Sequence, residues 1–83
     1  MNSIIINFKT MEEVEYFTNL MSKYDENIDV KYGRYVVDGK SYLGILALGL
    51  CKDLKIEFSD YNEQLIEELN NFRRRIINER NFS

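Results

Sequence analysis

The chain has 83 residues, of which 45% are apolar and 30% charged, and its net charge is −3 at pH 7. This length predicts a single domain over residues 1–83 with one hydrophobic core, and the composition excludes an intrinsically disordered chain. No stretch approaches the roughly 20 apolar residues that span a bilayer, and the N-terminus lacks the pattern of a signal peptide. We therefore expect a cytoplasmic protein without membrane insertion.

The charges are unevenly distributed along the chain. Residues 1–72 carry 7 basic and 13 acidic side chains, whereas residues 73–83 carry 4 basic and 1 acidic. Nucleic-acid binding requires Lys and Arg to neutralise phosphates, so the acidic body argues against it. The single Cys51 forms no internal disulfide and assembles no zinc site, so we expect a reducing compartment, no metal and no cofactor.

The first half of the chain predicts a strand, a helix and a hairpin. Ser3–Phe8 is apolar and β-branched, as in a buried strand. Thr10 and Glu13 have the spacing of a capping box, which predicts a helix from Met11. One apolar stripe of this helix faces the sheet, and it consists of Val14, Phe17, Leu20, Met21 and Tyr24. Two alternating segments then flank Gly33, which predicts a β-hairpin.

The second half predicts a short helix, a strand and a long helix. Ser41 is the natural N-cap of a short helix within Tyr42–Leu50, which Gly49 closes. Residues 54–58 alternate as a half-buried strand, and Asp60 is the expected N-cap of the last helix. The order is β-α-β-β-α-β-α. Because each helix has one apolar stripe, we expect an α+β fold with a four-stranded, mainly antiparallel sheet and three helices packed on one face.

This order, together with one segment, resembles the histidine phosphocarrier (HPr) family. Residues 37–50, VDGKSYLGILALGL, resemble that family's V-D-x-K-S-[IL]-[ML]-G-[ILV]-[MF]-x-L run, which holds its second helix. Residues 22–24, SKY, resemble the family's S-K-[FY] at the end of its first helix, at a distance that needs no gap. The resemblance extends roughly over residues 3–72 and implies the HPr fold.

The chemistry of the family's active site is missing. The family carries a histidine within G-[LI]-H-A-R-P, and the resemblance puts Thr10 at the histidine's position, Glu12 at the arginine's and Glu13 at the proline's. The chain contains no histidine. A phosphocarrier needs a nucleophile that keeps the phosphoryl group labile, whereas a threonine ester is too stable to pass it on. Two carboxylates would also repel the phosphoryl group, so we expect no catalytic residue and no enzyme.

Other residues of the resemblance point to regulation and partner binding. Ser41 matches the serine that a dedicated kinase phosphorylates in HPr proteins of low-GC Gram-positive bacteria, and a phosphate is well placed at a helix N-terminus. An ordinary N-cap serine, worth about 1 kcal/mol, is the favoured explanation of Ser41. Tyr42, Leu43 and Leu46 match the apolar positions through which HPr proteins contact partners. Two exposed residues among these three would form a docking patch. In the alternative, which is equally favoured, Leu46 fills the core while Tyr42 and Leu43 are scattered surface residues.

Two further features have alternative interpretations. The four C-terminal arginines either bind a nucleic-acid or phosphorylated partner or form a solvated helix end; they are Arg73, Arg74, Arg75 and Arg80. Cys51 is either a replacement nucleophile or a small buried apolar residue. The buried role is favoured, because Cys51 is far along the sequence from Thr10 and no histidine activates it.

The sequence thus favours a non-catalytic HPr-like protein of a Gram-positive bacterium that acts in regulation linked to sugar transport. Its expected partner is a component of the sugar phosphotransferase system or a transcriptional regulator, bound through the Ser41–Leu50 surface. One alternative is a phosphocarrier that uses a residue other than histidine. A second alternative is a small α+β domain associated with nucleic acid.

Overall fold

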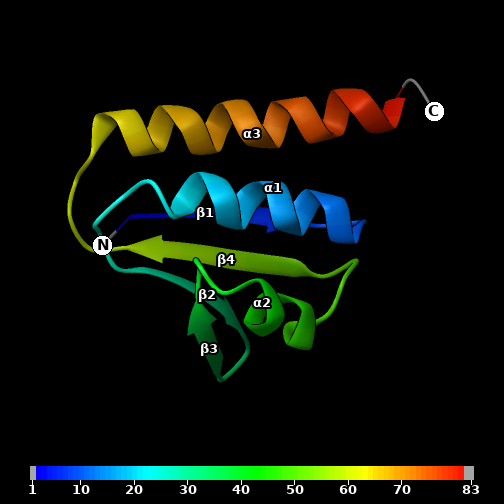
Figure 1. Ribbon diagram of the computed structural model, residues 1–83, viewed down its shortest axis with the longest axis horizontal. Coiled ribbons are helices and arrows are strands. Elements are labelled where there is room, and N and C mark those ends of the chain that lie inside the picture. The colour runs from blue at the N-terminus through cyan, green and yellow to red at the C-terminus, as the bar shows by residue number, and fades with distance from the viewer. Residues whose placement is uncertain (1, 82–83) are drawn as a thin grey trace.

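A computed structural model describes residues 2–81 of the chain, with side chains as far as Asn78. Its elements follow the predicted order β-α-β-β-α-β-α (Figure 1). They are β1 (Asn2–Asn7), α1 (Met11–Met21), β2 (Ile28–Tyr32), β3 (Tyr35–Asp38), α2 (Tyr42–Leu48), β4 (Asp53–Phe58) and α3 (Glu63–Asn81).

The four strands form one sheet in the order β1-β4-β2-β3. All three neighbouring pairs are antiparallel, and Ile56 of β4 lies opposite Ile4 on one side and Val30 on the other. The last strand in the sequence therefore lies between the first two, which are parallel to each other. This arrangement leaves β1 and β3 as the edges of the sheet.

The core lies between one face of the sheet and all three helices. Alternate strand residues point into it, and each helix contributes its apolar stripe, as the sequence predicts. The fully buried members are Ile6, Phe8, Val14, Phe17, Met21, Ile28, Val30, Ile45, Leu54, Ile56, Leu65 and Leu69. Phe72 completes an aromatic cluster in which its ring centroid lies 6.1 Å from that of Phe8 and 5.6 Å from that of Phe17. The fold is α+β with the helices on one face.

The opposite face of the sheet is mostly polar, although Ile5 and Val36 are exposed on it. Glu57 of β4 is buried there beneath two lysines: Lys31 Nζ lies 2.7 Å and Lys55 Nζ 3.1 Å from its carboxylate oxygens. Hydrogen bonds from Lys31, and then from Lys55, stabilise the ionised form and hold the pKa of the Glu57 carboxyl below its usual value. A charge on this face is thus tolerated because it is paired.

Two helix ends differ from the expectation. Helix α1 ends at Met21, so Tyr24 is buried from a turn beyond the helix and not from the helix itself. The N-cap of α3 is Asn62 and not Asp60, because Asn62 Oδ1 accepts the amide of Leu65 at 3.1 Å. Asn62 also donates to Glu26, which ties the start of α3 to the loop before β2.

Candidate functional site

Thr10, which the resemblance puts at the position of the HPr histidine, is the N-cap of α1. Its backbone is extended, with φ −131° and ψ 158°, and its hydroxyl accepts the amide of Glu13 at 3.1 Å. The Glu13 carboxylate reaches back and accepts the amide of Lys9 at 2.9 Å. The bond to the Thr10 hydroxyl is the one predicted, while the Glu13 carboxylate reaches the amide one residue before the N-cap. The Thr10 oxygen that would have to attack a phosphoryl group is engaged in holding the helix.

The first turn of α1 is acidic, because Glu12 and Glu13 are its second and third residues. Carboxylates here stabilise the helix, since its N-terminus carries a partial positive charge. They oppose a transferring phosphoryl group, whose developing negative charge needs cations or hydrogen-bond donors. The same residues that stabilise the start of the helix therefore give this position a negative local charge.

Cys51 differs from the sequence expectation. Its thiol is exposed, so the prediction of a buried apolar role is wrong. The residue follows the Gly49 cap of α2 and has φ +62°, an unusual left-handed conformation for a residue other than glycine. Its amide donates to the carbonyl of Phe8 at 2.7 Å. The loop that carries Cys51 is thereby joined to the segment that leads into Thr10, although 41 residues separate the two positions in the sequence.

Ser41 is the N-cap of α2, as predicted. Its Oγ accepts the amide of Gly44 at 3.1 Å, and its own amide donates to the carbonyl of Asp38 at 3.0 Å. The Asp38 carboxylate accepts the amide of Lys40 at 2.9 Å, which shapes the turn before the helix. These bonds give Ser41 one defined orientation at the start of α2.

Two glycines allow this turn to sit close to the sheet. A Cβ on Gly44 would lie 3.0 Å from Ser41 Oγ and 3.2 Å from Val37 Cβ. A Cβ on Gly39 would lie 2.8 Å from Ile28 Cγ2, and the Gly39 amide donates to the Ile28 carbonyl at 2.7 Å. The G-K-S-x-x-G spacing therefore has a packing reason that is independent of any modification of Ser41.

The Ser41 turn is also tied to the rest of the fold. Lys40 Nζ donates to the carbonyl of Tyr24, and the Tyr24 hydroxyl donates to the carboxylate of Glu68 on α3. Burial, together with the neighbouring carboxylate of Glu68, raises the pKa of Tyr24, so its hydroxyl stays protonated and remains a donor. This chain of bonds links the N-terminus of α2 to α3.

The three partner-binding candidates on α2 do not share one environment. Leu43 projects into solvent and is 75% exposed. Tyr42 and Leu46 are half-buried and pack against the core, while Ile45 is completely buried. Leu43 is thus the member of this group with a large exposed apolar surface, whereas Tyr42 and Leu46 expose only part of their side chains.

The C-terminal arginines bind within the protein as far as their side chains are described. Arg73 donates to the Ile5 carbonyl at 3.4 Å, and Arg74 donates to Asn71. Arg75 lies over the ring of Tyr16, 4.7 Å from the centroid, and donates to its hydroxyl at 2.7 Å. The side chain of Arg80 lies outside the described part of the chain. These contacts give the arginines a structural role on α3.

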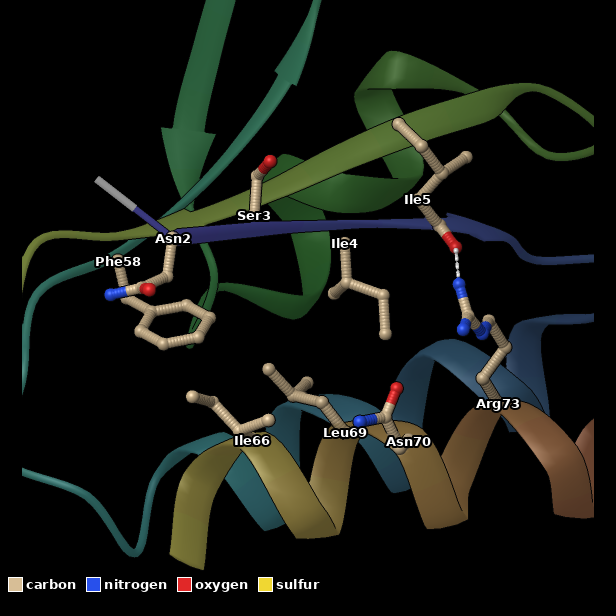
Figure 2. A pocket seen from close by; sticks show the side chains of 9 residues that line it. All are labelled: Asn2, Ser3, Ile4, Ile5, Phe58, Ile66, Leu69, Asn70 and Arg73. Carbon is tan, nitrogen blue, oxygen red and sulfur yellow. Dashed lines mark hydrogen bonds between the residues drawn. The ribbon is translucent and has the colours of Figure 1, made fainter. Parts of the chain in front are cut away.

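A groove of about 490 Å³ lies between the edge strand β1 and α3 (Figure 2). Figure 2 shows Ile4 and Leu69 facing each other across it, with Arg73 reaching up to the Ile5 carbonyl. The lining residues are Asn2, Ser3, Ile4, Ile5, Phe58, Ile66, Leu69, Asn70 and Arg73. None of the candidate residues at Thr10 or on α2 belongs to this lining, so the groove is separate from the site that the sequence indicates.

The described residues contain neither a metal-ligand cluster nor a membrane-spanning helix. Over residues 2–81, with side chains described as far as Asn78, no three histidine, cysteine, aspartate or glutamate side chains gather closely enough to hold a metal ion. None of the helices in the same range combines the length and the apolar character needed to cross a bilayer.

The architecture defines an α+β protein with an open-faced antiparallel sheet beneath three helices. No protein-family model matches the sequence, and no curated protein sequence matches it. Among solved structures, the chain is similar to HPr-C-His from Thermoanaerobacter tengcongensis, with 22% identity over 89% of this chain and 92% of that chain, and a TM-score of 0.73. It is also similar to the phosphocarrier protein HPr from Bacillus anthracis strain Ames, with 15% identity over 88% and 93% of the two chains, and a TM-score of 0.64. The chain therefore has the HPr fold.

Proposed function

We propose that this protein is a non-catalytic HPr-like module that binds a protein partner through the α2 surface, formed by Ser41, Tyr42, Leu43 and Leu46. The observation that carries the proposal is the contrast between two helix N-termini. At α1 an alcohol and two carboxylates occupy the helix start that the resemblance equates with the HPr active site, where phosphoryl transfer needs a labile nucleophile in a cationic setting. At α2 the first turn contains no acidic residue and presents the exposed Leu43.

Ser41 is the candidate for regulation of this surface. Its hydroxyl oxygen lies beside the Gly44 amide at the start of α2, and the residue is half-buried, so it borders the α2 surface without being enclosed. A phosphoryl group on Ser41 would add negative charge next to Leu43 and change which partner binds there. The resemblance of residues 37–50 to the HPr family supports a cytoplasmic role in sugar-transport regulation of a Gram-positive bacterium.

Titration calorimetry with purified proteins tests this function. The partners to be tested are the first enzyme of the sugar phosphotransferase system and the carbon-regulation transcription factor from the same organism. We expect one of them to bind at micromolar concentration, and Leu43→Ser to weaken binding by about tenfold, as loss of an interface anchor does. Tyr61→Ser is the matched control, because Tyr61 is 74% exposed and lies outside α2. Absence of binding to both partners would contradict the proposal, as would equal effects of the two substitutions.

The contact between Cys51 and the loop before α1 favours one second candidate, a phosphocarrier that uses a thiol. Cys51 is exposed, and its amide bonds to the Phe8 carbonyl beside the position of the family's histidine. Thiolates are stronger nucleophiles than alcohols at neutral pH. Incubation with the first enzyme and radiolabelled phosphoenolpyruvate tests it. Label on the wild type that Cys51→Ser removes would establish the carrier and overturn the non-catalytic proposal, whereas an unlabelled wild type would exclude the carrier.

A further inference from the structure

An exposed aromatic pair lies beside α2, at the end of the β2–β3 hairpin. Tyr32 and Tyr35 are opposite each other in the hairpin register, next to the turn at Gly33, and are 41% and 58% exposed. Two residues further along the strands, Val30 and Val37 form the next pair on the same face, and Val30 is buried in the core. Both tyrosine rings therefore project from the helix-covered face of the sheet.

Helix α2 is too short to cover these rings. A hollow of about 430 Å³ remains between the hairpin and the C-terminal half of α2. We name its lining the hairpin patch; it consists of Tyr32, Tyr35, Val36, Val37, Ala47, Leu48 and Lys52. Every member except Lys52 is apolar or aromatic. Ala47 is exposed and stands one helical turn after Leu43, so the hairpin patch is continuous with the α2 surface.

Two cations accompany the two rings. Lys52 Nζ lies 4.9 Å from the centroid of the Tyr32 ring, and Arg34 Cζ lies 5.7 Å from that of Tyr35. No carboxylate belongs to the lining of the hollow. Asp53, which follows Lys52 in the sequence, accepts a hydrogen bond from Asn7 and is thereby held on the polar face of the sheet. The hairpin patch is thus locally basic on a chain whose first 72 residues are mostly acidic.

We propose that the hairpin patch binds an acidic segment of a partner protein, with one apolar side chain in the hollow and carboxylates facing Lys52 and Arg34. Exposed tyrosines next to a cation, around an apolar hollow, have the composition of a protein-interface anchor. Complementary charge favours an acidic segment over a basic one. A nucleic acid would also stack on the rings, but its affinity depends on many neutralised phosphates, and this site offers two cations. The proposal deepens the function proposed above, because it specifies the chemistry of the partner.

Selection from a random dodecapeptide library displayed on phage, with the full chain as bait, tests this chemistry. We expect the enriched peptides to carry more than one acidic residue around a single aromatic or aliphatic residue. The leading synthetic peptide, titrated into the ¹⁵N-labelled protein, should shift the amide signals of Tyr32, Tyr35, Ala47 and Lys52 more than others. Enrichment of basic or uncharged peptides, no enrichment, largest shifts in the groove between β1 and α3, or tighter binding of oligo-dT would each overturn the proposal.

A pair of charge-reversal variants completes the test. Arg34→Glu with Lys52→Glu should weaken binding of the leading peptide by about tenfold, since both exposed cations then repel it. Lys9→Glu with Lys23→Glu is the matched control, because both lysines are exposed, lie outside the hairpin patch and change the net charge equally. Circular dichroism checks that both variants fold. Equal weakening by the two variants would overturn the proposal.

Failure of this inference can be told apart from failure of the proposed function. If a phosphotransferase-system protein binds and responds to Leu43→Ser but not to Arg34→Glu with Lys52→Glu, the function stands and the hairpin patch is not used. If the peptide binds as expected but neither protein partner does, the hairpin patch stands and the assigned partner is wrong.

Discussion

Removing the Ser41 hydroxyl should loosen α2. Ser41 Oγ accepts the Gly44 amide at 3.1 Å, and α2 has seven residues with no acidic residue in its first turn and no basic residue in its last. Loss of an N-cap typically costs about 1 kcal/mol, and such a short helix has little other support at its N-terminus. We expect Ser41→Ala to lower the free energy of unfolding by about 1 kcal/mol and Tm by roughly 4–8 °C, as for a domain of this size.

The Ser41→Asp variant distinguishes the capping role of Ser41 from the effect of a negative charge at this position. Ser41→Asp keeps a capping oxygen and adds negative charge where the helix dipole favours it, so stability should remain within about 0.5 kcal/mol of wild type. Urea unfolding followed by far-ultraviolet circular dichroism at pH 7 measures both variants, and Thr10→Ala at the α1 cap is the control. The reasoning is refuted if Thr10→Ala costs about 1 kcal/mol while Ser41→Ala leaves stability unchanged.

Substitutions at three other positions test the core, the polar face and the Cys51 turn. Ile56 is completely buried, so Ile56→Ala should lower the free energy of unfolding by about 2–5 kcal/mol and Ile56→Val by about 0.5–1.5 kcal/mol. Urea unfolding measures both variants, and equal losses would contradict the close packing around Ile56. Lys31 and Lys55 lower the folded-state pKa of Glu57. The ionised carboxylate therefore stabilises the fold above the ordinary pKa of 4.5, and this stabilisation is lost as the pH falls through the folded-state pKa. Glu57→Gln should therefore flatten the acidic limb of the stability–pH curve, and an unchanged limb would refute this. Cys51 has φ +62°, a left-handed conformation that glycine adopts without strain, so Cys51→Gly should raise stability by about 0.5–1 kcal/mol. Cys51→Ala should not raise it, and thermal unfolding measures both variants.

The helix caps show how far local sequence determines local structure. The caps at Thr10 and Ser41 were predictable because the acceptor and the amide it binds are three residues apart. The cap of α3 was not, because Asp60 and Asn62 both have the required side-chain oxygen. Asn62 also donates to Glu26, 36 residues away, and that contact exists only in the folded protein.

The candidate site was likewise only partly predictable from the sequence. Residues 37–50 identify the Ser41 turn from sequence, since G-K-S-x-x-G corresponds to close backbone packing at Gly39 and Gly44. The environment of Cys51 was not predictable, because an apolar neighbourhood in the sequence does not specify a left-handed turn that exposes the thiol. The hairpin patch was also missed. Its only sequence signal is a pair of tyrosines flanking a two-residue turn that contains Arg34, whereas Lys52 and the α2 residues come from elsewhere in the chain.

The sequence by itself determined the order of the elements, the apolar stripes, two of the helix caps and the lack of an imidazole at the position of Thr10. These depend on residue type and on hydrogen bonds between near neighbours, which the chain carries before it folds. Only the tertiary structure decided that Leu43 is the strongly exposed member of the α2 surface, that Cys51 lies against the loop before α1, and that Lys52 meets Tyr32. Such pairings depend on how strands and helices pack across the sheet, and sequence spacing does not specify them.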